Sequence, residues 1–326
     1  MFSRERFRDW ILLLVCNLIW SSQYVLVKTV QKQMGPIAAT SIPMCIATLL
    51  LAPIVNFEAR KSPTETPRSS LRDNWMAFLV IGVCGQVAAQ LFITWGVRFT
   101  LASNAALLML ALPIITSLVA HLVLGETMGR IRWISFGLAL AGIAECSGVN
   151  WKTLNLSNSH YVIGNLLILA SVCGSAFYNV YSKKLLSHYT PLQVLLYSYY
   201  FAVAFLIPIT IVFEPGFPRQ AMHYAIHTWI GIALLAGLLY FSSMVLFLMV
   251  LTRLDATQAS LSNYMIPFFG VVIAAIVLHE RLTISIVIGG ALVLLSTLLI
   301  TVHEERTASR HASGRLMITT PEDRTG

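Results

Sequence analysis

The feature that most constrains this chain is a long apolar stretch that occurs twice. Residues 101–127 read LASNAALLMLALPIITSLVAHLVLGET, and residues 255–281 read DATQASLSNYMIPFFGVVIAAIVLHER. At an offset of 154 the identical pairs include Ala102 with Ala256, Ala105 with Ala259, Pro113 with Pro267, Leu124 with Leu278 and Glu126 with Glu280. Each copy runs for more than 20 residues without a charge. That length is enough to cross about 30 Å of hydrocarbon as a helix.

Eight more apolar segments surround these two, so the sequence predicts an all-α membrane protein with ten transmembrane helices. The expected spans are 10–30, 36–57, 75–97, 101–124, 131–149, 161–182, 191–213, 229–251, 256–278 and 284–302. Hydrophobic residues make up 57 % of the 326 residues and charged residues only 11 %. Soluble domains carry about 25 % charged residues, so a soluble globular protein is excluded.

The repeat covers the whole chain, because Trp75 also meets Trp229 at the same offset. We therefore expect a short cytoplasmic N-terminus (1–9), a first five-helix repeat (10–150), a second five-helix repeat (160–303) and a disordered cytoplasmic tail (304–326). Five is an odd number, so the second repeat enters the membrane from the opposite side. The sequence thus predicts two inverted repeats.

Lysine and arginine predict the orientation. With ten spans, 16 of the 22 basic residues fall on the side of the N-terminus and 6 on the other side. Short cytoplasmic loops are enriched in these residues, so both termini are expected in the cytoplasm. The net charge of +8 is explained by this bias, and we expect no nucleic-acid partner. The five cysteines lie in apolar segments without metal-ligand spacing, so we expect no metal site.

Polar residues inside the spans indicate where water or substrate lies, because they are costly in lipid. In the first span such residues follow at i, i+4, i+7 and i+11, on one helix face: Asn17, Ser21, Tyr24 and Lys28. The offset of 154 leads to Ser171, Ser175, Tyr178 and Ser182 in the sixth span. Small hydroxyls also join helices to one another, and that interpretation stays open. The two tyrosines and a lysine without a counter-charge favour a shared cavity.

Further polar candidates lie in the other spans. Gln86 and Gln90 are one turn apart in the third span, and Gln86 meets Tyr240 at the same offset. The ninth span carries Asn263 and Tyr264, whereas the matching fourth span is nearly all apolar after Asn104. The two halves therefore differ in chemistry. This difference suits a substrate with a polar end and an apolar or aromatic body.

Few ionisable residues fall within the spans. Lys28 lies near a helix end and can extend to the interface, so a role at the membrane surface is an alternative to substrate binding. His121 and Glu145 are candidates for proton transfer, although structural roles are favoured for both. Glu126 and Glu280 follow equivalent spans, and we expect them to bond the exposed N–H groups of the next helix.

The sequence contains no GxSxG elbow, HExxH, Walker loop or Gly-rich dinucleotide turn, so we expect neither an enzyme nor a cofactor. The ten predicted helices, the run Leu18-Ile19-Trp20-Ser21-Ser22-Gln23-Tyr24, and the glutamate after spans four and nine resemble the EamA-type family of the drug/metabolite transporter superfamily. The resemblance covers about residues 10–302. It departs in the sixth span, where Gly174 stands in the place of Trp20.

The resemblance implies a transporter in the bacterial inner membrane, with a central cavity between the halves, that exports amino acids or other small metabolites. The candidate substrate-binding residues are Trp20, Tyr24, Lys28, Gln86, Gln90, Asn104, Tyr178, Tyr240, Asn263 and Tyr264. A translocase for a lipid or lipid-linked precursor is the main alternative, and a membrane scaffold or sensor is a third. The sequence leaves the coupling ion and a homodimer open.

The predicted topology can be tested by cysteine labelling. Cysteines introduced at Ser69 and Ser313 should react with a membrane-impermeant maleimide only from the cytoplasmic side, and one at Ser157 only from outside. The reason is that an odd number of expected spans separates Ser157 from each of the other two positions. Labelling of positions 157 and 313 from the same side would contradict the inverted repeats.

Overall fold

The structure is a computed structural model that describes residues 4–61, 71–124, 129–146, 159–251, 265–280, 283–296, 298–299 and 302. All the regular secondary structure in these ranges is helical. The helices are α1 (Arg4–Val30), α2 (Pro36–Lys61), η1 (Leu71–Asn74), α3 (Trp75–Val80), η2 (Ile81–Val87), α4 (Ala88–Phe99), α5 (Ala102–Leu108), η3 (Met109–Ala111), α6 (Leu112–Leu124), α7 (Arg130–Cys146), α8 (Ser159–Leu185), α9 (Pro191–Phe213), α10 (Phe217–Ala221), α11 (Ile226–Leu234), η4 (Leu235–Ser243), α12 (Met244–Leu251), α14 (Met265–Leu278) and a last helix, Ile284–Ser296.

Six of the described helical stretches are long and apolar enough to cross a membrane. They are Ile11–Val30, Pro36–Phe57, Trp75–Phe99, His160–Leu185, Pro191–Phe213 and Ile226–Phe247. Shorter apolar helices occupy Ala102–Ala111, Trp133–Gly142, Phe269–Leu278 and Ile284–Ser296, within the other four expected spans. The chain is therefore a multi-pass membrane protein. The expected tail 304–326 and the labelling positions 69, 157 and 313 lie outside the described residues.

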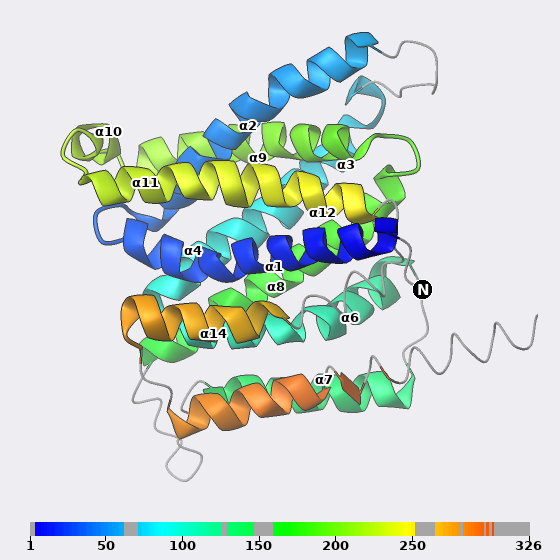
Figure 1. Cartoon of the computed structure of the whole chain (residues 1–326), viewed down its shortest axis with the longest axis vertical. Coiled ribbons are helices and arrows are strands. Elements are labelled where there is room, and N and C mark those ends of the chain that lie inside the picture. The colour runs from blue at the N-terminus through cyan, green and yellow to red at the C-terminus, as the bar shows by residue number, and fades with distance from the viewer. Residues whose placement is uncertain are drawn as a thin grey trace, which may run out of the picture.

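The long helices run side by side, and helices far apart in the sequence are neighbours (Figure 1). α2 packs against α9, α1 against α14, and α4 against α8. The last helix lies beside α7 at the opposite edge of the view from α2. A Cβ added at Gly142 of α7 would lie only 2.7 Å from the carbonyl oxygen of Gly289, so these two backbones are in close contact.

Two segments of π-helix interrupt long helices at matching places. η2 begins at Ile81 and η4 at Leu235, and 81 plus 154 is 235. A short 3-10 helix, η3, separates α5 from α6 just before Pro113. π-turns widen a helix locally and often occur at functional sites. The π-helical segments therefore interrupt regular α-helix at equivalent positions of the two halves.

Glycines bring α4 and α8 into backbone contact. A Cβ at Gly96 would lie 2.8 Å from the Gly164 carbonyl oxygen, and a Cβ at Gly174 would lie 2.7 Å from the backbone nitrogen of Ala89. Small residues of this kind allow membrane helices to approach closely. The contact also explains why Gly174 stands in the place of Trp20, because no larger side chain fits against α4 there.

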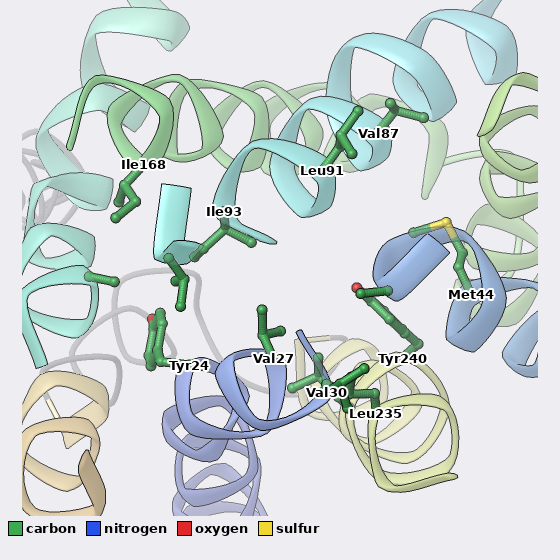
Figure 2. Close-up of a cluster of buried hydrophobic side chains, with 14 of the residues drawn as sticks. Tyr24, Val27, Val30, Met44, Val87, Leu91, Ile93, Ile168, Leu235 and Tyr240 are labelled. Carbon is green, nitrogen blue, oxygen red and sulfur yellow. The ribbon is translucent and has the colours of Figure 1, made fainter. Parts of the chain in front are cut away.

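The main hydrophobic cluster joins elements of both halves of the chain (Figure 2). In the figure, side chains of α1 lie beside those of η4: Val27 and Val30 with Leu235 and Tyr240. Met44 of α2 lies close to Tyr240. The neighbours α1 and α2 thus both pack on η4, which belongs to the other half. The residues of α1, α2 and η4 therefore share one hydrophobic core.

The glycine contact between α4 and α8 predicts the effect of adding one methyl group. Gly96→Ala places a Cβ 2.7 Å from the Ile168 side chain and should lower stability by about 1–3 kcal/mol through overpacking. Gly137→Ala is the matched control, because nothing lies within 4 Å of its Cβ position and alanine favours helix. The thermal unfolding midpoint in detergent should fall for Gly96→Ala alone. Equal midpoints would contradict the close contact.

Candidate functional site

A cavity of about 110 Å³ lies among α1, η2, α4 and α8, with η3, α6, α12 and α14 completing its wall. Its lining residues are Trp20, Gln23, Tyr24, Gln86, Ala89, Gln90, Ile93, Met109, Leu112, Ser171, Ser175, Tyr178, Asn179, Met244, Phe247 and Ile266. Four pairs in this lining are related by the offset of 154: Tyr24 with Tyr178, Gln90 with Met244, Ile93 with Phe247 and Leu112 with Ile266. Both halves of the chain thus contribute equivalent positions to one cavity.

One wall of the cavity is polar but uncharged. Gln23 donates from Nε2 to Oε1 of Gln90 at 2.9 Å, which joins α1 to α4. Ser175 and Asn179 of α8 are further polar residues of the lining. None of the lining residues carries a formal charge. This wall can therefore donate and accept hydrogen bonds, but it holds no counter-ion for a charged group.

The Tyr178 hydroxyl is buried without a hydrogen-bond partner. Its side chain is buried, and its oxygen makes no hydrogen bond of good geometry, although Gln86, Ser182 and Ser198 are its polar neighbours. The Ser182 hydroxyl is also buried without a partner. Burying a hydroxyl without a hydrogen bond is unfavourable, so such groups call for an explanation. Tyr178 lines the cavity but Ser182 does not, and both hydroxyl oxygens are themselves buried.

The rest of the lining is mainly apolar and aromatic. The ring of Trp20 meets that of Phe247 edge to face at 4.9 Å, and the Trp20 Nε1 donates to Oγ of Ser243 at 2.9 Å. Met244 and Ile266 belong to this part of the lining as well. In the other half, Gly174 and Ala89 occupy the positions of Trp20 and Ser243. At Trp20 a large side chain therefore lies between α1 and η4, whereas at Gly174 the backbones of α8 and α4 are in close contact.

The structure brings half of the predicted site residues together. Trp20, Tyr24, Gln86, Gln90 and Tyr178 line the cavity. Lys28, Asn104 and Tyr240 are not in the lining, and Asn263 and Tyr264 lie outside the described residues. That any of these side chains binds substrate stays a prediction.

Two of the residues away from the cavity are held in the protein interior. Asn104 is 1 % exposed and donates from Nδ2 to Asn165 at 2.7 Å and to Thr100 at 2.9 Å. Tyr240 is also 1 % exposed; its carbonyl accepts a hydrogen bond from the Tyr199 hydroxyl, and its own hydroxyl has no partner. Asn104 therefore has a structural role in this conformation.

The sequence analysis missed several lining residues, namely Gln23, Ala89, Ile93, Met109, Leu112, Asn179, Met244, Phe247 and Ile266. The repeat offset was a usable signal for two of them, because it relates the candidate Gln90 to Met244 and the candidate Asn263 to Met109. Polarity alone could not identify the apolar wall, since the same residue types also face lipid.

Lys28 has a partner, which corrects the expectation of a lysine without a counter-charge. Its Nζ donates to Oε1 of Glu280 at 2.9 Å and to the Thr100 carbonyl at 3.0 Å. Glu280 also accepts from the backbone N–H groups of Ala102 and Ser103, each at 3.0 Å. The glutamate therefore caps α5 in the first half, and the expectation that it caps the next helix was wrong.

The hydrogen bonds of Glu280 affect its titration. Burial raises the pKa of this carboxyl, but the bonds from the Ser103 backbone, the Lys28 side chain and the Ala102 backbone lower the pKa by more. The pKa of Glu280 therefore lies below its ordinary value. The ionised carboxylate is the form that these contacts stabilise.

A second, wider recess of about 540 Å³ lies at the start of α2. It is lined by Gly35, Pro36, Ile37, Trp95, Arg98, Phe213, Glu214, Pro215, Gly216, Phe217 and Gln220. The Glu214 carboxylate accepts from the backbone N–H groups of Ile37 at 3.0 Å and Ala38 at 2.9 Å. Glu214 thus caps α2 from the other half of the chain, as Glu280 caps α5.

Comparisons with known proteins agree with this architecture. Two stretches of the chain, residues 9–146 and 162–302, each match the EamA-like transporter family. The chain belongs to this family. Family membership identifies the protein as a transporter, as the resemblance in the sequence predicted.

The relatives of this EamA-like protein are distant. It is 20 % identical over 277 residues to the uncharacterized transporter YoaV of Bacillus subtilis, covering 85 % of this chain and 91 % of the relative. It is 25 % identical over 291 residues to a probable terminal-alkyne amino-acid exporter of Streptantibioticus cattleyicolor, covering 89 % and 92 %. A solved crystal structure shares the fold with a TM-score of 0.59 at 18 % identity, covering 94 % of this chain and 99 % of the other.

Proposed function

We propose that this EamA-like protein is a secondary carrier or facilitator that exports a small organic metabolite across the bacterial inner membrane. In this proposal, ten transmembrane helices form two inverted five-helix repeats, with both termini in the cytoplasm. The substrate binds between the repeats and crosses by alternating access. Exchanging the conformations of two similar halves converts an inward-open carrier into an outward-open one.

The observation that carries the proposal is the cavity, because four pairs of repeat-related positions line it. The helix contacts support the same symmetry. α1 packs against η4 and α14, and the repeat-related helix α8 packs against η2 and α6. The π-helical segments η2 and η4 also begin at repeat-related residues. A two-fold relation between the halves accounts for all three.

The two walls of the cavity indicate the kind of substrate. Gln23, Gln90 and Ser175 offer hydrogen bonds to a polar end. Trp20 and Phe247 offer an aromatic surface to an apolar body. A substrate without net charge fits best, since the described lining holds no ionised side chain. An amino-acid-like or amphipathic metabolite has these properties, and one relative is named as a probable amino-acid exporter.

The size of the cavity favours a carrier over a lipid translocase. Its volume of about 110 Å³ is below the range of about 300–1,000 Å³ found for typical ligand pockets. A small metabolite can fill such a space, whereas a lipid or lipid-linked precursor needs a larger groove.

Filling the cavity should stop export. Cells with the wild-type protein should release at least one amphipathic metabolite into the medium that cells with Ser175→Trp retain, because the indole occupies the cavity. Cys173→Trp is the matched control, since Cys173 lies on the same helix but on the exposed face. Untargeted mass spectrometry of medium and cells measures the difference. The same profile for all strains, including one without the protein, would contradict a carrier.

Transport should run mainly down the gradient of the substrate. A charge in the middle of a membrane helix costs about 3 kcal/mol, and the described cavity lining contains no carboxylate or histidine that could cycle a proton. Uptake of the identified metabolite into proteoliposomes should therefore respond weakly to an imposed pH gradient. The measurement includes Glu145→Gln and His121→Asn. Strong proton-driven accumulation that either substitution abolishes would show a coupling residue.

A further inference from the structure

Glu280 ties three separate parts of the chain together at one end of the bundle. It follows α14, forms an ion pair with Lys28 of α1, and accepts hydrogen bonds from the first residues of α5. The Ser103 hydroxyl adds a further bond at 2.9 Å. One carboxylate thus receives four bonds from two other segments. The pair is well shielded, since the Glu280 side chain is 6 % exposed and that of Lys28 is 28 % exposed.

This cluster lies between the cavity and one end of the protein. Along α1, Tyr24 lines the cavity and Lys28 follows one turn later, about 6 Å further along the helix axis. Met109 lines the cavity in the segment that begins with Ala102, and Ile266 lines it in the helix that ends just before Glu280. All three segments therefore converge on Glu280 beyond the cavity. Separating them there is required to open this end.

The repeat supplies only part of this cluster at the other end. At the offset of 154, Glu280 corresponds to Glu126, and Ala102 and Ser103 correspond to Ala256 and Thr257. Lys28, however, corresponds to Ser182. In the sequence, the glutamate and two small residues recur, but a serine replaces Lys28. Hydrogen bonds between charged partners are about twice as strong as neutral ones. The contact made by Lys28 at one end is therefore stronger than a contact that Ser182 can make at the other end.

We propose that the Lys28–Glu280 ion pair is a one-sided latch that closes the carrier at the end where α1 finishes. Because Ser182 stands at the position equivalent to Lys28, closure at the opposite end is weaker, so the resting carrier opens toward that side. In the proposed orientation this is the cytoplasm. The latch rests on the alternating access of the proposed function and assigns Lys28 to gating instead of substrate binding.

The test measures access to the cavity and needs no substrate. A variant without the five native cysteines receives a single cysteine at Ser175, which lines the cavity. Right-side-out and inside-out membrane vesicles are treated with an impermeant maleimide, and the labelling rate from each side is measured. Lys28→Met removes the ammonium and keeps the apolar stem, while Glu280→Gln keeps an acceptor for the α5 N–H groups. Lys32→Met, at an exposed lysine one turn further on, is the matched control.

Each latch variant should raise the labelling rate from the side of the α1 C-terminus roughly ten-fold, which corresponds to about 1.4 kcal/mol. The rate from the other side should not rise, and Lys32→Met should match the parent. The double variant Lys28→Met/Glu280→Gln should be no faster than the faster single variant, because both remove the same interaction.

Other results would overturn the latch. A purely structural ion pair predicts a lower unfolding temperature and equal changes on both sides. An unchanged rate in both single variants, or effects that multiply in the double variant, would also reject it. If position 175 reacts from neither side in every variant, alternating access fails as well. Side-selective labelling combined with an unchanged metabolite profile would keep the latch and reject only the proposed transport activity.

Discussion

Every peptide group inside a bilayer needs a hydrogen-bond partner within the protein, because lipid offers none. Among the described helices, η2, η3 and η4 depart from α-helical geometry within the apolar stretches, and each contains buried residues. The free N–H groups at two helix starts are satisfied by carboxylates from the other half of the chain, Glu214 for α2 and Glu280 for α5. Both glutamates therefore serve the backbone and join the two halves.

Capping a helix from a distant segment makes the cap removable. A residue within the same helix stays close to its N–H groups in every conformation, as Thr190 does at the start of α9 through its capping box with Gln193. A carboxylate on another segment stays there only while the two segments remain together. This difference is why a cap such as Glu280 can also control the opening of the protein.

Duplication supplies similar backbones, and substitutions make the two halves different. The Trp20 side chain lies between α1 and η4 and bonds to Ser243, whereas Gly174 at the related position allows α8 to approach the α4 backbone closely. Gln86 lines the cavity, whereas the related Tyr240 is packed in the interior. The result is a cavity with one polar and one aromatic wall between backbones of similar design.

The sequence by itself determined the membrane class, most of the spans and the repeat offset, because hydropathy and periodicity are local properties of the chain. It also identified Tyr24 and Tyr178 as inward-facing candidates, since a helical period defines a face. Only the tertiary structure decided which faces meet. Lys28 and Glu280 are 252 residues apart, and Asn104 and Asn165 are 61 apart. Such pairings depend on the packing of whole helices, which no local pattern encodes.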